Sequence, residues 1–138
     1  MKILLVGGSG FLGAWVARFL HINQCLARIF DPNKPDSEWH RLSGIRADAT
    51  EWVAGDVSKK SELDDAIRDC EGVINLAGLL TPECSQNPVR GAEVNLIGAI
   101  NVFEGALKHG LKKVAYTSSI GVYGPDHAEF PEPTTHYG

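Results

Sequence analysis

The sequence has 138 residues, of which 43% are hydrophobic and 22% are charged, and these values suit one globular domain over residues 1–138. Its net charge of −4, without a basic stripe, argues against a nucleic acid partner. The three cysteines are far apart, which argues against a disulfide framework and favours reduced thiols, so we expect a cytoplasmic domain. The histidines lack metal-ligand spacing, which argues against a structural metal. No apolar stretch approaches the ~20 residues of a membrane span.

Short apolar runs alternate with segments of helical periodicity along the chain. The run over residues 3–6 ends at glycines, which predicts a strand buried on both faces. The other predicted strands cover residues 26–30, 52–54, 72–76 and 113–117. Helices are predicted over residues 11–20, from a cap at Ser58 or Ser61 to Asp69, and over residues 90–108. Whether the polar stretch 32–51 contains a further helix is left open.

This alternation predicts an α/β fold. Parallel strands need long crossovers, and right-handed crossovers place helices on both faces of the sheet. We therefore expect a doubly wound, Rossmann-like parallel sheet with strand order 3-2-1-4-5. Glycines and prolines after residue 120 predict an irregular loop. The three tryptophans, Trp15, Trp39 and Trp52, are expected to be packing residues rather than to form a ligand cage.

A glycine-rich turn follows the first predicted strand and opens the first predicted helix. Residues 7–13 read GGSGFLG, with Gly7, Gly10 and Gly13 at the spacing of dinucleotide-binding turns. The start of a helix presents backbone N–H groups and the positive end of the helix dipole, which together attract a pyrophosphate. A side chain at Gly10 would block this approach, and Gly13 allows the helix to pack closely on the sheet.

An acidic residue stands where such a turn requires one. Asp31 ends the second predicted strand, close to the ~20 residues at which the fingerprint places an acid. Its carboxylate would accept hydrogen bonds from the ribose hydroxyls and repel a 2′-phosphate, so we expect NAD rather than NADP. The alternative is a plain tight turn capped by Asp31, but turn, helix and acid occur together, which favours the cofactor.

Asp56 and Val57 follow the third predicted strand. Asp56 could accept a hydrogen bond from the adenine amino group, or it could be the aspartate that starts the next helix. The sequence leaves both interpretations open.

Four segments in chain order then carry a resemblance to a known family. They read GGSGFLG at 7–13, INLAGLL at 74–80, EVNLIGAINVFEGALKHGLKKVAYTSS at 93–119 and SSIGVYG at 118–124. Together they resemble the NAD-dependent epimerase/dehydratases, which are extended short-chain dehydrogenases/reductases, over nearly the whole chain.

The resemblance implies a role for each matching cofactor-site residue. The backbones of Phe11 and Leu12 would lie at the pyrophosphate. Asn95 would face inward from the long helix, to the cofactor, to the backbone of the neighbouring strand, or to both. The other implied contacts are Asp31 and Asn33 at the adenosine ribose, Asp56 and Val57 at adenine, Leu76, Ala77 and Gly78 along the cofactor, and Ser118 at the nicotinamide.

The resemblance also implies two catalytic residues. Ser119 matches the family's catalytic serine, and Tyr137 resembles its general acid/base tyrosine. A phenol has a pKa of about 10, so a nearby lysine and the positive nicotinamide must favour the phenolate. The position four residues after Tyr137 lies beyond Gly138, where that lysine cannot be checked, and the alternatives are strand-end hydroxyls and an ordinary loop aromatic.

The implied enzyme is an NAD-dependent epimerase, dehydratase or dehydrogenase that acts on a sugar or nucleotide-sugar. Family members are longer, so we expect an incomplete C-terminal side of the sheet and a fragment that binds the cofactor without turnover. The alternatives are a non-catalytic module that binds or senses NAD(H), and a reductase of a non-sugar ketone. A homodimer through the helices that flank strands four and five, including residues 90–108, is plausible.

Overall fold

A computed structural model describes residues 1–119 of the chain. Within them, five strands form one sheet, and its order β3-β2-β1-β4-β5 confirms the predicted topology. Every strand pairs with its neighbours in parallel. The strands are β1 (Lys2–Val6), β2 (Leu26–Phe30), β3 (Glu51–Val53), β4 (Gly72–Asn75) and β5 (Lys113–Tyr116).

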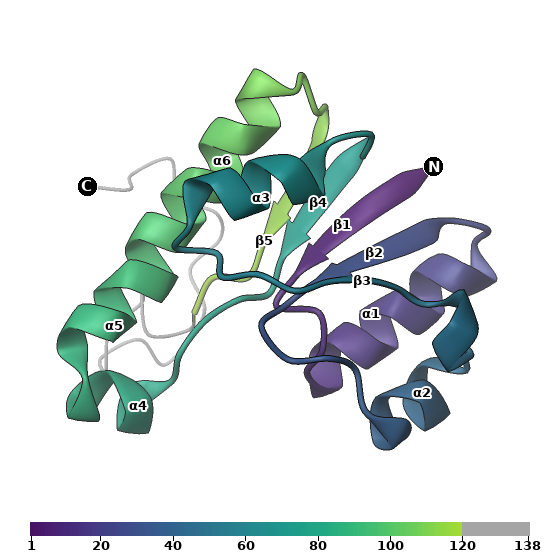
Figure 1. Cartoon of the computed structure of the whole chain (residues 1–138), viewed down its shortest axis with the longest axis horizontal. Coiled ribbons are helices and arrows are strands. Elements are labelled where there is room, and N and C mark those ends of the chain that lie inside the picture. Colours follow the sequence, from purple (N-terminus) through teal and green to yellow (C-terminus); the bar gives the residue numbers. More distant parts are fainter. Residues whose placement is uncertain (120–138) are drawn as a thin grey trace, which may run out of the picture.

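Helices cover both faces of the sheet (Figure 1). On one face, α1 (Phe11–Ile22) and α2 (Ser37–Ser43) pack on a core that includes Ile3, Leu5 and Ile29. On the other face, α3 (Lys60–Ile67) and α6 (Gly98–Lys108) pack on a core that includes Leu4, Val6 and Val73. Neighbouring residues of β1 thus enter opposite cores, as the alternation of side chains along a strand requires. This double burial explains why residues 3–6 are a continuous apolar run.

The predicted helix over residues 90–108 exists but is longer and less regular. It consists of α5 (Pro88–Ala92), a π-helical turn (Glu93–Ile97) and α6, which follow one another directly. Short π-helical turns inside longer helices are frequent at functional sites. The helix α4 (Thr81–Gln86) and a 3₁₀ turn (Ala47–Ala49) were not predicted.

The predicted serine cap of the third helix is wrong. Helix α3 begins at Lys60 after Lys59, and no side chain caps it. Ser58 instead donates its backbone N–H and its hydroxyl to the carboxylate of Asp56, at 2.9 and 2.8 Å. An aspartate side chain that accepts from the backbone N–H two residues further along forms a local turn, and the helix begins only after this turn.

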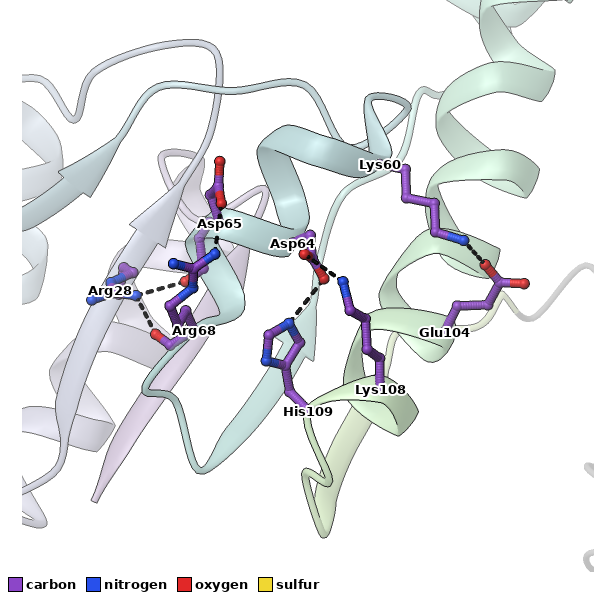
Figure 2. A network of polar contacts seen from close by, with 9 residues as sticks. Arg28, Lys60, Asp64, Asp65, Arg68, Glu104, Lys108 and His109 are labelled. Carbon is purple, nitrogen blue, oxygen red and sulfur yellow. Dashed lines mark hydrogen bonds and ion pairs between the residues drawn. The ribbon is translucent and has the colours of Figure 1, made fainter.

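Arg28 on β2 closes the other end of α3. Its guanidinium donates to the carbonyl oxygens of Ala66 and Arg68, both at 2.7 Å, and Figure 2 shows it beside that end of the helix. These carbonyls would otherwise lack partners at the helix C-terminus. Among the described residues, no helix is long and apolar enough to cross a membrane.

Candidate functional site

A cavity of about 430 Å³ lies at the carboxyl ends of β1 to β4. Its walls come from the segments that follow these strands, and α5 contributes Arg90. β1 pairs with β2 on one side and with β4 on the other, so the strand order reverses at this point of the sheet. Ligands of open parallel sheets bind at such a switch point. The cavity is therefore the candidate site.

The glycine turn forms the floor between β1 and α1. Gly7 has φ of 73°, in the left-handed region that favours glycine. A Cβ atom on Gly13 would stand 2.0 Å from the carbonyl oxygen of Gly8, whereas one on Gly10 would meet no atom of residues 1–119 within 4 Å. In the described part of the chain, no side chain caps the start of α1 at Gly10. The first amides of α1 therefore lie at an open approach that an anion can use.

Asp31 connects the end of β2 to this turn. Its side chain is buried, and its two carboxylate oxygens accept hydrogen bonds from the backbone N–H groups of Ser9 and Asn33, at 3.1 and 2.9 Å. The hydroxyl of Ser9 also donates to the carbonyl of Asn33, at 2.6 Å. The acid is thus held in place beside the glycine turn, on the wall of the cavity.

Two tryptophans fix the backbone around the site. The indole N–H of Trp39 donates to the carbonyl of Gly8 at 2.8 Å, and that of Trp52 donates to the carbonyl of Asp31 at 3.2 Å. Both rings also pack in the core on the α1 side, as the sequence predicted. Their hydrogen bonds were not predicted, because they join residues that are 31 and 21 positions apart.

Asp56 lies on the opposite wall with a cationic partner. Besides its two bonds from Ser58, its carboxylate accepts a hydrogen bond from the Arg90 guanidinium at 2.6 Å. Partial burial raises the pKa of Asp56, but the hydrogen bonds from Ser58 and Arg90 lower this pKa by more than burial raises it. The pKa of Asp56 therefore lies below its usual value. Asp56 therefore stays ionised at neutral pH.

Asn95 shapes the loop that follows β4. From the π-helical turn, its side chain accepts from the N–H of Leu79 at 2.7 Å and donates to the carbonyl of the same residue at 2.9 Å. Asn75, which is buried, accepts from the N–H of Ala77 at 3.1 Å. The backbone that Asn95 binds is therefore that of the loop after β4, whereas the predicted alternative was that of the strand itself.

The structure brings most of the sequence-predicted cofactor residues to the cavity. Those that line it are Gly7, Gly10, Asp31, Asn33, Asp56, Val57, Leu76, Ala77 and Gly78. Gly13 and Asn95 support its walls from behind, and the side chains of Phe11 and Leu12 point to solvent, with exposed fractions of 73% and 54%.

Within residues 1–119, Ser118, predicted at the nicotinamide, and Ser119, predicted to be catalytic, do not line this cavity. Both are exposed and follow β5 after Thr117, and Tyr137 lies outside the described residues. The lining residues that sequence reasoning did not assign to the site are Val6, Ser9, Phe30, Pro32, Gly55, Leu79, Arg90 and Val94. Ser9, Leu79 and Val94 lie within segments that carry the family resemblance, so these segments could have marked them. Arg90 lies outside those segments and reaches the cavity through the fold. Within residues 1–119, no group of three potential ligands is placed to hold a metal ion.

Comparisons with known proteins agree with this arrangement. The sequence profile of the NAD dependent epimerase/dehydratase family matches residues 3–138. The bifunctional UDP-glucose 4-epimerase and UDP-xylose 4-epimerase 1 of Pisum sativum is 33% identical over 133 residues, 89% of this chain and 38% of that protein. The 3 beta-hydroxysteroid dehydrogenase type 7 of Homo sapiens is 33% identical over 132 residues, 93% of this chain and 35% of that protein.

A solved structure has the same fold. The crystal structure of a short-chain dehydrogenase/reductase superfamily protein from Agrobacterium tumefaciens, with bound NAD, superposes with a TM-score of 0.74 at 26% identity. The match covers 94% of this chain and 36% of that one. The chain thus spans less than two fifths of the length of each of these three proteins.

Proposed function

Since the chain belongs to the NAD dependent epimerase/dehydratase family, we propose that residues 1–138 form the NAD-binding domain of an enzyme that acts on a sugar or nucleotide-sugar. One observation carries the proposal. The uncapped start of α1 and the carboxylate of Asp31 lie at the same cavity, at the switch point of the sheet. This combination suits a ligand with a pyrophosphate and an adjoining ribose.

The residues at the cavity fit NAD part by part. The open space at Gly10 leaves room for the pyrophosphate to reach the first amides of α1. Asp31 is held beside the glycine turn, and there it would accept hydrogen bonds from the adenosine ribose hydroxyls. The same carboxylate would repel a 2′-phosphate, which disfavours NADP. Asp56 and Val57 border the end of the cavity that we assign to adenine.

The chemistry proposed for the whole enzyme is hydride transfer at a substrate carbon that bears oxygen. NAD supplies the hydride acceptor when it is bound. Ser119, in the segment that follows β5, would hold the substrate oxygen, and Ser118 would border the nicotinamide. Tyr137 would move the proton, which requires a nearby cation to favour its phenolate.

The substrate class is supported by the relatives. The pea relative is named for UDP-glucose and UDP-xylose, which supports a nucleotide-sugar. The human hydroxysteroid dehydrogenase has the same identity to this chain, and this makes a steroid-like hydroxyl or ketone the second candidate.

Calorimetric titration of the chain with NAD and with NADP tests the proposal. We expect NAD to bind at least about tenfold more tightly, since Asp31 would face the extra phosphate across a few ångströms. Asp31→Asn should reduce this preference, because it removes the charge but keeps the shape. Tighter binding of NADP, or no binding of either nucleotide, would contradict the proposal.

A further inference from the structure

Arg90 is a charged side chain on the cavity wall that the sequence analysis did not single out. It lies on α5, where the Asn87 side chain accepts from its backbone N–H at 3.0 Å. One guanidinium nitrogen donates to Asp56 at 2.6 Å, and the other donates to the Ser58 hydroxyl at 3.1 Å and to Glu93 at 3.2 Å. The planar fork of arginine can hold these three partners at once, whereas a lysine ammonium is a point charge.

The hydrogen bonds to Asp56 can be counted oxygen by oxygen. A carboxylate offers about four acceptor positions, two on each oxygen. Oδ1 of Asp56 accepts both the N–H and the hydroxyl of Ser58, so its two positions are filled. Oδ2 accepts the guanidinium of Arg90. Among the bonds of residues 1–119, one acceptor position therefore remains, on Oδ2, and Asp56 borders the cavity.

The orientation of this carboxylate depends on Arg90. Ser58 holds Oδ1 through two hydrogen bonds, and within residues 1–119 Arg90 is the partner that holds Oδ2. The ion pair with Arg90 fixes Oδ2, because charge-assisted hydrogen bonds to guanidinium are short and directional. An ionised carboxylate accepts hydrogen bonds and cannot donate one. The remaining position of Oδ2 thus selects a donor N–H group and rejects an acceptor oxygen.

We infer that Arg90 is a positioning residue that aims the open acceptor position of Asp56 at the exocyclic amino group of the nucleotide base, so that the site selects an amino-purine over an oxo-purine. The inference rests on the proposed NAD function. It gives Arg90 a role in base selectivity, in addition to the ion pair by which Arg90 links α5 to the segment after β3.

Base selectivity can be measured with an NAD analogue. Nicotinamide hypoxanthine dinucleotide differs from NAD at the purine, where an oxo group replaces the amino group. Its carbonyl oxygen would face the Asp56 carboxylate without a proton between them. We expect the unaltered chain to bind NAD at least about tenfold more tightly than this analogue.

The decisive variant is Arg90→Leu, measured by calorimetry with both nucleotides. We expect the ratio of the two dissociation constants to fall to about threefold or less, because Oδ2 loses its fixed direction. The matched control is Arg68→Leu, which removes an exposed arginine that pairs with Asp65 on the outer side of α3. The control should keep the full ratio. A purely structural role of Arg90 would lower both affinities equally and leave the ratio unchanged.

Arg90→Lys keeps the charge and serves where the leucine variant fails to fold. It should give an intermediate ratio, because an ammonium can pair with Asp56 but cannot also hold Ser58 and Glu93 in one plane. An unchanged or larger ratio in the variants, while NAD still binds the unaltered chain, overturns the inference alone. Failure of the unaltered chain to bind NAD overturns the proposed function and this inference with it.

Discussion

Two aspartates on either side of the start of α3 have similar surroundings and different roles. The Asp56 and Asp64 side chains have exposed fractions of 27% and 23%, so burial does not distinguish them. Each pairs with a cation from the segment that runs from α5 to the residue after α6. Asp56 pairs with Arg90, and Asp64 contacts both Lys108 and His109 at 2.8 Å (Figure 2).

Their positions relative to the sheet separate the two aspartates. Asp56 follows a strand at the carboxyl edge, where its carboxylate borders the cavity. Asp64 lies on α3 and faces α6, and the neighbouring pair of Lys60 with Glu104 joins the same two helices. The same ion-pair chemistry therefore occurs on the cavity wall at the strand ends and between two helices on the outer surface. Exposed ion pairs of the second kind contribute little to stability.

Of the substitutions at the cavity, Gly13→Ala should have the largest effect on stability and on NAD binding. The new Cβ would stand 2.0 Å from the Gly8 carbonyl oxygen, which Trp39 holds from another direction. Neither group can move away, so we expect a loss of stability of about 3 kcal/mol or more and no detectable NAD binding. Chemical denaturation and calorimetry measure the two effects. A stable variant that binds NAD normally would show that the turn is looser than described.

A smaller effect is expected for Trp39→Phe. The ring volume is largely kept, but the Gly8 carbonyl loses its buried donor. An unpaired buried carbonyl costs about 1–3 kcal/mol, and the glycine turn should become less ordered. We expect NAD affinity to fall by about three- to tenfold. The control is Trp15→Phe, which alters a tryptophan on the exposed side of α1, and equal effects in the two variants would contradict the account.

The smallest effect is expected for Asp64→Asn, which removes only the ion pairs of Asp64 with Lys108 and His109, away from the cavity. Hydrogen bonds from Lys108 and His109 hold the pKa of Asp64 below its usual value. A lowered folded-state pKa contributes stability that is complete above the unfolded pKa of about 3.9 and is lost as the pH falls through the folded value. The variant should melt slightly earlier at neutral pH, converge with the unaltered chain in acid, and bind NAD normally. Weaker NAD binding would remove the distinction between the two aspartates.

The sequence predicted the sheet well because its signals are local. An apolar run such as residues 3–6, ended by glycines, identifies a strand, and alternation with helices then implies the order. Helix α2 was left open because it is short and polar, and it depends on an Asp36 cap and on the burial of Trp39. The pairing of Arg90 with Asp56 joins residues 34 positions apart, so only the fold brings them together.

The central claim is that the open backbone at Gly10 receives the pyrophosphate, and Gly10→Leu tests it most directly. Gly10 has an extended backbone that any residue adopts, with φ of −80° and ψ of 178°, and its Cβ would meet no atom of the described residues within 4 Å. We predict an unchanged melting temperature and NAD affinity lower by about 100-fold, which corresponds to the loss of two charge-assisted hydrogen bonds. A variant that folds and binds NAD as tightly as the unaltered chain would contradict the account.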